Sequence, residues 1–349
     1  MTVRVGFLGA GLIATYHGKM LHGSGTEHDI VAVHDPDRSR AEAFAAASGA
    51  RALPTEDEVI EACDAVYVCT WTSEHRRLVE AVAAAGRAVF CEKPLATGLA
   101  DALAMVEVVE AAGVVNQVGL VLRDSPAFGF LRHLVQAPVS GRVMAVVFRD
   151  DQYLPVQGMY ASDWRGDAAR AGAGTLLEHS IHDLDLLEWL FGAVTSVSGR
   201  AGAFHGLDGI EDVVVATAAL ADGATASLTS VWHDLLERPS LRRMEVLCER
   251  AFYVLEGDVW GPVRWTRPDG DEGALEGEGL VAAVTEQVGP PRNPDGAFID
   301  AVAAGRPASP GLADALRPHL LVDAVYRSCG DGGSPVAVPP GRPVEVPWS

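Results

Sequence analysis

The first 120 residues alternate between short apolar runs and longer Ala- and Glu-rich segments, and this alternation restricts the fold more than any other feature of the chain. The apolar runs are nearly continuous, which is typical of strands buried on both faces of a parallel sheet. Strands and helices alternating at this spacing predict a doubly wound α/β domain. We expect its strands at Val3–Leu8, Ile30–His34, Ala65–Cys69, Ala88–Cys91 and Val114–Leu120, and its helices at Ile13–Leu21, Arg38–Ala47, Thr55–Ala62, Glu74–Ala85 and Leu99–Ala112.

The second part of the chain has a different pattern. Alternating or β-branched segments follow one another with turns between them, which indicates a large, open, mostly antiparallel sheet. We expect these strands at Val143–Asp150, Val194–Gly199, Val213–Leu220, Ala224–Trp232, Met244–Cys248, Ala251–Leu255 and Val263–Thr266. Helices are expected at Ser125–Gln136, Thr175–Phe191, Ala297–Ala304 and Gly311–Cys329, and a mobile surface loop at Arg267–Gly279. The sequence therefore predicts an α/β domain at residues 1–122 and an α+β domain at residues 123–349.

The composition disfavours several classes of partner. Lys and Arg number 27 and Asp and Glu 47, so the formal charge is −20 and the chain should repel nucleic acid and anionic membranes. No apolar run reaches the roughly 18 residues of a membrane span, and the first residues lack the pattern of a signal peptide. The five cysteines are scattered without a CxxC pair, which disfavours a zinc–thiolate site and fits a reducing cytoplasm.

A glycine-rich turn follows the first expected strand and opens the first helix. The segment Gly9–Ala14 reads G-x-G-x-x-A, in which the first glycine permits a tight turn and Gly11 lets a pyrophosphate approach the helix N-terminus. Asp35 ends the second strand, where a carboxylate can bind ribose hydroxyls and would repel a 2′-phosphate. The pattern predicts a site for NAD, with NADP still possible because Arg38 lies nearby. The alternative is a plain tight turn, with Asp35 capping the next helix.

Two further strand ends carry polar side chains. The expected strand Ala65–Cys69 leads into Thr70, Trp71, Thr72 and His75, at the edge of an open α/β sheet where ligands bind. The next strand ends in Glu92-Lys93-Pro94, and Lys93 follows an apolar run at that same edge. We interpret Lys93 as a functional group, while a solvated surface lysine is the alternative.

The segment Ala171–Leu190 holds a third group of candidate residues. Glu178 and His182 are four residues apart, which places them on one face if a single helix runs through both, and Asp185 follows on nearly the same side. A buried imidazole paired with carboxylates can exchange a proton near neutral pH. One alternative is a hydrogen-bonded core histidine. A metal site is the other, but His179, His182 and Asp183 diverge around a helix, so we expect no metal.

Taken together, these motifs resemble the Gfo/Idh/MocA oxidoreductases, whose members include glucose–fructose oxidoreductase and inositol dehydrogenase. The shared features are GAGLIA, Asp35, Glu92-Lys93-Pro94, and a glycine run leading to Glu178-x-x-x-His182-x-x-Asp185. The resemblance extends over essentially the whole chain. It implies an N-terminal Rossmann domain and a C-terminal domain whose sheet forms homodimers or homotetramers. Gly172-Ala173-Gly174 departs from the three glycines of many members, which matters if position 173 needs a positive φ.

The resemblance also implies residue roles. Lys93 would hold the reacting oxygen, His182 would be the acid/base, and Glu178 stands where many members have Asp. The expected catalytic residues are thus Lys93, His182 and Glu178. Expected cofactor contacts are Gly9, Gly11, Leu12, Ile13, Asp35, Arg38, Thr70, Trp71, Thr72, His75, Glu92, Lys93, Gln117, Trp164 and Arg165. Expected substrate contacts are Lys93, Arg123, Tyr153, Glu178, His179 and His182.

The function implied is NAD(P)-dependent hydride transfer to or from a secondary alcohol of a sugar or cyclitol. Two other functions stay open. One is a lyase or glycoside-cleaving enzyme that oxidises its substrate transiently with tightly held NAD. The other is a non-enzymatic module that senses NAD. We expect a small polyhydroxylated substrate, no nucleic acid and no membrane partner.

Overall fold

The computed structural model describes residues 2–341 of the chain, which divide into two compact units. The first unit comprises the chain up to Leu120 together with Ala169–Gly172 and Arg292–Leu316. The second comprises Val121–Ala168, Ala173–Pro291 and the chain from Arg317 onward. The later segments Ala169–Gly172 and Arg292–Leu316 therefore belong to the first unit. They contribute the charged side chains of Arg170 and Asp295, respectively.

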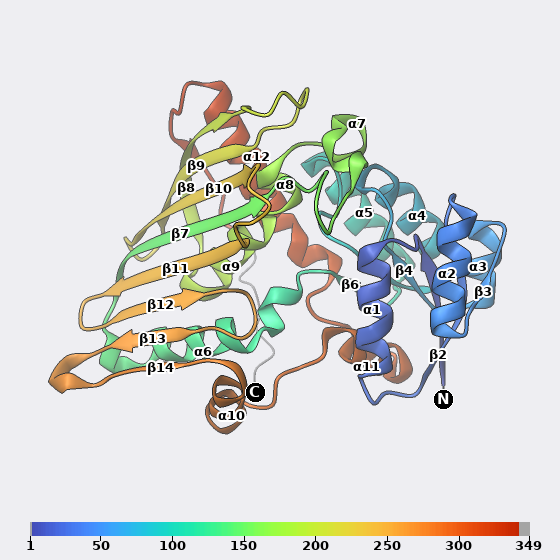
Figure 1. Cartoon of the computed structure of the whole chain (residues 1–349), viewed down its shortest axis with the longest axis horizontal. Coiled ribbons are helices and arrows are strands. Elements are labelled where there is room, and N and C mark those ends of the chain that lie inside the picture. Colours follow the sequence, from blue (N-terminus) through green and yellow to red (C-terminus); the bar gives the residue numbers. More distant parts are fainter. Residues whose placement is uncertain (1, 342–349) are drawn as a thin grey trace. The chain divides into compact units, whose positions relative to one another are not determined.

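The sheet of the first unit is parallel throughout (Figure 1). Its strands are β1 (Val3–Leu8), β2 (His28–His34), β3 (Arg51–Ala52), β4 (Ala65–Val68), β5 (Ala88–Cys91) and β6 (Asn116–Val118). They lie in the order β3-β2-β1-β4-β5-β6, which is that of a Rossmann fold and confirms the predicted doubly wound domain. The strand order reverses between β1 and β4. Ligands bind in such sheets outside the carboxyl ends of the strands at this point.

Helices pack on this sheet largely as the sequence predicts. They are α1 (Leu12–His22), α2 (Arg38–Ser48), α3 (Glu56–Ala62), α4 (Thr72–Ala84), α5 (Leu99–Ala112) and, from later in the chain, α11 (Pro294–Ala304). The returning segment Ala169–Gly172 also contains most of a short helix that was not predicted, α7 (Ala168–Ala171). Local signals set their ends. The Thr55 hydroxyl accepts the Glu58 amide at the start of α3, and Gly113 ends α5 in the left-handed conformation.

The second unit is built on a nine-stranded sheet. Its strands are β7 (Val143–Tyr153), β8 (Val194–Gly202), β9 (Val213–Leu220), β10 (Thr225–His233), β11 (Leu241–Cys248), β12 (Phe252–Glu256), β13 (Val263–Thr266), β14 (Glu272–Leu275) and β15 (Val336–Ala337). The order is β14-β13-β12-β11-β7-β10-β9-β8-β15. Only the β7–β10 pair is parallel among these described strands, so the mostly antiparallel sheet is confirmed.

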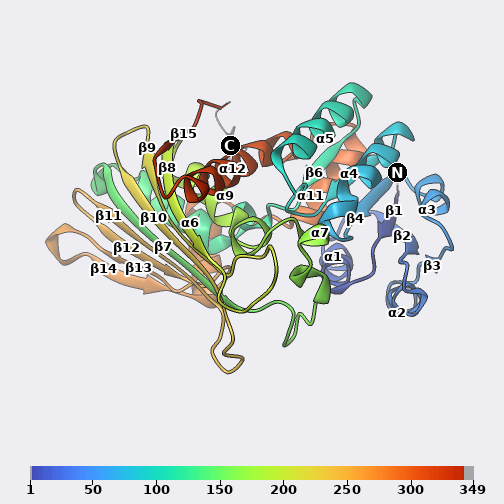
Figure 2. The same cartoon turned by 90° about the horizontal axis from the view of Figure 1, so that it is seen from above.

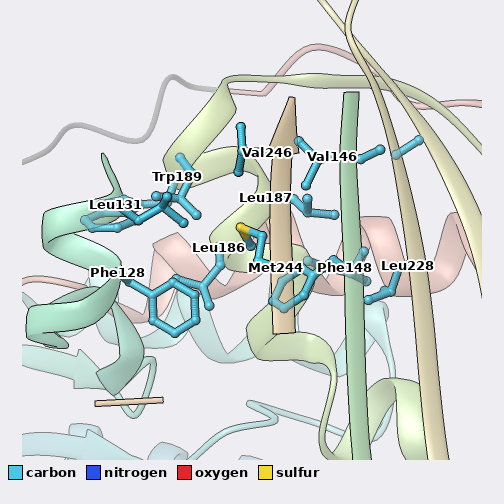
Figure 3. Close-up of a cluster of buried hydrophobic side chains, with 14 of the residues drawn as sticks. Phe128, Leu131, Val146, Phe148, Leu186, Leu187, Trp189, Leu228, Met244 and Val246 are labelled. Carbon is cyan, nitrogen blue, oxygen red and sulfur yellow. The ribbon is translucent and has the colours of Figure 1, made fainter. Parts of the chain in front are cut away.

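Three helices cover one face of this sheet: α6 (Pro126–Gln136), α9 (Ile181–Phe191) and α12 (Leu316–Gly330) (Figure 2). The core between them is apolar (Figure 3), and it includes Phe128, Leu131, Val146, Phe148, Leu186, Leu187, Trp189, Leu228, Met244 and Val246. Because side chains alternate along a strand, the neighbour of Val146 and Phe148 points the other way, and Val147 is 46% exposed. None of the helices in residues 2–341 is long and apolar enough to cross a membrane.

The expected surface loop at Arg267–Gly279 is wrong. This segment contains β14, which pairs with β13, and the first turn of a helix that was not predicted, α10 (Gly277–Gln287). The segment is polar because β14 is an edge strand. Gly273 leaves room there for the ring of Trp265, which a Cβ at that position would overlap.

The expected single helix at Thr175–Phe191 is also wrong. Two helices, α8 (Thr175–Glu178) and α9, are separated by His179 and Ser180. The Ser180 hydroxyl donates to Ser230 on β10 at 2.6 Å, so this break is attached to the sheet. Glu178 and His182 consequently belong to different helices.

The apolar stripe of α5 gives a test of this packing. We expect Met105→Ala to lower the free energy of unfolding by about 2–5 kcal/mol, because Met105 is fully buried and the change leaves a cavity. Leu103→Ala in the same helix is the control. Leu103 is 44% exposed, so its loss should cost below about 1 kcal/mol. Denaturant unfolding of both variants measures the difference, and equal losses would contradict the assigned helix face.

Candidate functional site

The glycine-rich turn between β1 and α1 has the geometry that a dinucleotide needs. Gly9 has a φ of 92°, and a Cβ there would overlap the carbonyl oxygen of Cys69 beside it. A Cβ on Gly11 would meet nothing within 4 Å, so the space over the start of α1 is open. Among the described residues no side chain caps this helix, whose first amides can therefore bind a phosphate. Ala14 is fully buried, as expected for the small third position of the motif.

The Asp35 carboxylate joins the end of β2 to this turn. Its Oδ2 accepts the Ala10 amide at 2.8 Å and its Oδ1 accepts the Asp37 amide, also at 2.8 Å. These bonds fix a negative charge beside the glycine turn, where an adenosine ribose would lie. Arg38, which could attract a 2′-phosphate, instead donates to Glu42 at 2.7 Å. The electrostatics at this strand end therefore favour NAD.

The loop after β4 lies beside the turn that follows β5. In the buried His75 ring, Nδ1 lies 3.0 Å from the carbonyl oxygen of Pro94, and Nε2 lies 3.3 Å from the carbonyl oxygen of Thr70. His75 therefore connects the loop after β4 with the turn after β5. Burial lowers the pKa of His75. Trp71 is stacked under the guanidinium of Arg170, which lies 3.9 Å from the ring centroid. Arg170 comes from the returning segment 169–172 and was not predicted from the sequence.

Beneath the β5 turn lies a buried group of three ionisable side chains. His17 on α1 places its Nε2 2.8 Å from Oε1 of Glu92 and its Nδ1 2.7 Å from Oδ1 of Asp295 on α11. Burial alone would lower the pKa of His17, but the charges and hydrogen bonds of the two carboxylates outweigh it and raise the pKa to about 10. Because the pKa of His17 is higher in the folded chain than in the unfolded chain, protonated His17 stabilises the fold. This stabilisation is fully present below pH 6.5 and is lost as the pH rises through about 10.

In the second unit, ion pairs hold acidic residues on both sides of His182 in the sequence. His182 lies in the first turn of α9 and is 8% exposed. Arg165 donates from Nε to Glu178 Oε1 at 2.5 Å, and Arg123 donates from Nε and Nη2 to the two oxygens of Asp185 at 2.8 and 2.5 Å. Two of the predicted acidic side chains are thus each held by an arginine that was also predicted as a site residue.

Sequence reasoning missed Arg242, the central cation of this unit. This fully buried guanidinium donates to Asp150, Asp183 and Asp258 at 2.8, 2.7 and 2.5 Å. Burial raises the pKa of Asp150, but the charges of Arg242 and His179 outweigh this and hold it well below its usual range. Burial and the nearby Asp150 charge raise the pKa of Asp183. The strand was expected to start at Met244, so Arg242 lay outside every predicted element.

The other predicted contacts occupy defined positions. His179 has its Nε2 3.0 Å from Asp150 Oδ2, and Tyr153 packs on Tyr160 with ring centroids 5.4 Å apart. Trp164 stacks on the guanidinium of Arg165. Gln117 is buried and donates to the carbonyl oxygen of Pro294 at 2.9 Å. The roles of all these residues remain predictions.

The glycine run before α8 differs from the expected pattern without backbone strain. Gly172 has a φ of 89° and lies against Thr97, whereas Ala173 is not among the described residues with positive φ. Gly174 is essential for a different reason, because a Cβ there would overlap the carbonyl oxygen of Glu211. Alanine is therefore compatible with the middle position.

Comparison with known proteins identifies relatives for both units. Residues 3–120 match the family described as "Oxidoreductase family, NAD-binding Rossmann fold", and residues 128–254 match the "GFO/IDH/MocA C-terminal domain". The inositol 2-dehydrogenase 2 of Paenarthrobacter aurescens is 30% identical over 97% of this chain and 99% of its own length. The inositol 2-dehydrogenase of Cereibacter sphaeroides is 35% identical over 54% of each chain, so the match spans about half of that relative.

Solved structures share the fold at lower identity. Levoglucosan dehydrogenase in complex with NADH and levoglucosan superposes with a TM-score of 0.84, covering 97% of this chain and 100% of that one at 20% identity. The WlbA dehydrogenase of Bordetella pertussis, in complex with NADH and UDP-GlcNAcA, superposes with a TM-score of 0.83 at 24% identity over 97% of this chain and 99% of that one.

The position of Asp35 predicts the coenzyme preference. We expect wild-type protein to bind NAD⁺ more tightly than NADP⁺. Asp35→Ala should weaken NAD⁺ binding by about 10- to 100-fold, since a hydrogen bond from a ribose hydroxyl to a charged carboxylate contributes about 1.5–3 kcal/mol. Arg38→Ala is the control and should leave the ratio unchanged, because Arg38 already pairs with Glu42. Titration calorimetry with both coenzymes measures these values, and equal wild-type affinities would contradict the prediction.

Proposed function

The chain belongs to the Gfo/Idh/MocA family of oxidoreductases, and from this premise we propose that it is an NAD-dependent dehydrogenase acting on a secondary alcohol of a sugar or cyclitol. We propose Lys93, His182 and Glu178 as its catalytic residues. The named relatives support the substrate class, since they act on inositols and anhydro sugars according to their names. The physiological substrate would therefore present several hydroxyl groups.

The observation that supports this proposal most directly is the situation of Lys93. The chain has only two lysines, Lys19 and Lys93, among its 27 lysines and arginines. Lys93 follows β5, which pairs with β4 and so lies one strand beyond the reversal between β1 and β4, and its backbone amide donates to Glu92 at 3.1 Å. A compact ammonium on a fixed turn suits the stabilisation of an alkoxide, because its charge is localised.

His182 is the proposed acid/base. An imidazole can take the hydroxyl proton during oxidation and return it during reduction. Arg165 fixes the orientation of Glu178, and the bidentate pair of Arg123 with Asp185 anchors α9, from which His182 projects. These ion pairs would hold the polar groups in place before substrate binds, which lowers the reorganisation needed during reaction.

The chemistry divides between the coenzyme and the chain. NAD⁺, when bound at the glycine turn and Asp35, supplies the acceptor for the hydride that leaves the substrate carbon. We propose that Lys93 and His182 act on the same substrate hydroxyl. The Lys93 ammonium stabilises negative charge on the oxygen, and His182 removes the proton. In the reverse direction the same groups polarise a carbonyl and protonate the alkoxide.

Replacing the two proposed groups tests this function. Lys93→Met and His182→Ala should each lower turnover by about 10²–10⁴-fold, the usual contribution of acid–base catalysis, while NAD⁺ binding stays nearly unchanged. Formation of NADH is followed by its absorbance with a panel of inositols, free sugars and anhydro sugars. Coenzyme affinity is measured separately by titration.

Lys19→Met is the matched control, since it removes the other lysine of the chain and should keep full activity. Full activity of both Lys93→Met and His182→Ala would overturn the assignment. Substrate conversion without net NADH, by protein that already carries nucleotide, would instead indicate internal redox catalysis.

We also propose that the enzyme is a homo-oligomer that associates through the uncovered face of the nine-stranded sheet. This face exposes apolar side chains on four strands, in contrast to the face packed against helices: Val147, Val215, Leu247 and Phe252. They are 36–47% exposed, and exposed apolar side chains on one face of a sheet are typical of an interface.

Light scattering on the purified protein tests the association. Val147→Glu should shift the mass towards the monomer, because a charge would be buried unpaired at the interface. Leu103→Glu, on an exposed position of α5 in the other unit, should leave the mass unchanged. A monomeric wild-type protein would contradict the proposal.

A cytoplasmic location is proposed as well. All five cysteines are free thiols, and four of them are buried. Burial raises the pKa of Cys63 to about 12 and that of Cys248 to about 11, which makes these thiols unreactive. Free, unreactive thiols fit a reducing compartment.

A further inference from the structure

The buried group of His17, Glu92 and Asp295 connects three elements of the first unit. His17 lies on α1, Glu92 directly follows β5, and Asp295 lies in the first turn of α11. His17 and Asp295 are fully buried, and Glu92 is 7% exposed. Buried charges of this kind are retained only with close partners, because each loses its hydration. The imidazole supplies a partner to both carboxylates, at 2.8 and 2.7 Å.

The two carboxylate oxygens of Glu92 contact different partners, His17 and the backbone of the turn that follows β5. Oε1 contacts the imidazole, and Oε2 accepts the backbone amide of Lys93 at 3.1 Å. Gly119, after β6, makes room for this arrangement, since a Cβ there would overlap the Glu92 carboxylate. The Glu92 carboxylate is therefore held at one end by the imidazole and holds the Lys93 backbone at the other.

We propose that His17 is a positioning residue for Lys93: through Glu92 it fixes the backbone from which the Lys93 side chain projects. This proposal depends on the proposed function in one respect, which is that Lys93 is a catalytic residue. His17 touches neither the substrate nor the coenzyme in this proposal. Asp295 orients the imidazole from its other side.

Charge explains why an imidazole suits this position. Burial raises the pKa of Glu92, but the hydrogen bond and charge of His17, together with the charge of Lys93, outweigh it and lower the pKa overall. Glu92 thus stays ionised and keeps two acceptor oxygens. Without the bond from His17, one oxygen would be buried without its donor and the carboxylate could turn away from the Lys93 amide.

Two substitutions of His17 separate positioning from general support of the fold. The amide nitrogen of Gln matches the place of imidazole Nε2, whereas that of Asn matches Nδ1. His17→Gln therefore keeps the bond to Glu92, and His17→Asn keeps the bond to Asp295. Both remove the same positive charge from the same buried position.

We expect His17→Asn to lower kcat by about 100-fold, the effect of misplacing a reacting group by about 1 Å, with little change in the KM for NAD⁺. His17→Gln should stay within a few-fold of wild type. Equal losses of kcat in the two variants would overturn the proposal, because a purely structural role does not distinguish Glu92 from Asp295.

Amide hydrogen exchange of Lys93 gives a readout that needs no turnover. The Lys93 N–H donates to Glu92, so the exchange rate of this N–H reports whether the bond is kept. The next residue, Pro94, has no N–H and adds no exchange signal of its own. Exchange should be faster in His17→Asn than in His17→Gln or wild type, and unchanged exchange in His17→Asn would overturn the proposal. If wild type oxidises no sugar or cyclitol, the proposed function fails while this measurement still decides the positioning role.

A second pair covers the case in which His17→Asn does not fold. Glu92→Ala and Asp295→Ala each remove one carboxylate from the imidazole, but of these two only Glu92 accepts the Lys93 amide. Glu92→Ala should lose kcat and speed Lys93 exchange, whereas Asp295→Ala should lower the melting temperature and leave Lys93 exchange slow. The reverse pattern would overturn the proposal.

Discussion

A single buried imidazole holds together the parts of the first unit on which its proposed chemistry depends. His17 joins the helix that opens the dinucleotide turn, the strand end that carries Lys93, and a helix formed almost 300 residues later in the chain. An apolar side chain could not replace it, because Glu92 Oε1 and Asp295 Oδ1 would then each lose the imidazole as a buried partner. The packing of α11 on the Rossmann sheet and the conformation of the Lys93 turn thus depend on the same two hydrogen bonds.

In the second unit, arginines rather than a histidine are the partners of the buried carboxylates. Arg242 lies fully buried among Asp150, Asp183 and Asp258, and Arg123 pairs with Asp185 beneath the helix that carries His182. In both units a network of ion pairs therefore includes residues on the same element as the proposed reacting group or next to it in the chain. Such networks cost desolvation energy and add little to net stability. Their benefit is orientation, since charges fixed before the substrate arrives need not reorganise during the reaction.

Short-range patterns predicted much of this architecture. Continuous apolar runs indicated the parallel strands, and the glycine turn with Asp35 indicated the nucleotide edge, because both depend on residues close in sequence. The break at His179–Ser180 was not predictable in this way. An i, i+4 spacing assumes one continuous helix, whereas the Ser180 bond to β10 ends the first helix early. The edge strand β14 was missed because it is only four residues long, contains a glycine and pairs with β13 alone among the described strands.

The sequence by itself determined the fold class and the nucleotide-binding edge and supplied the side chains that we propose as catalytic, since each follows from local periodicity or a compact motif. Only the tertiary structure decided which buried charged side chains pair with one another. His17 meets Asp295 across 278 positions of the chain, and Arg242 meets Asp150 across 92. Contacts at such separations leave no periodic trace in the sequence. They are selected by the free energy of burying charge, which favours the one chain arrangement that pairs each ion.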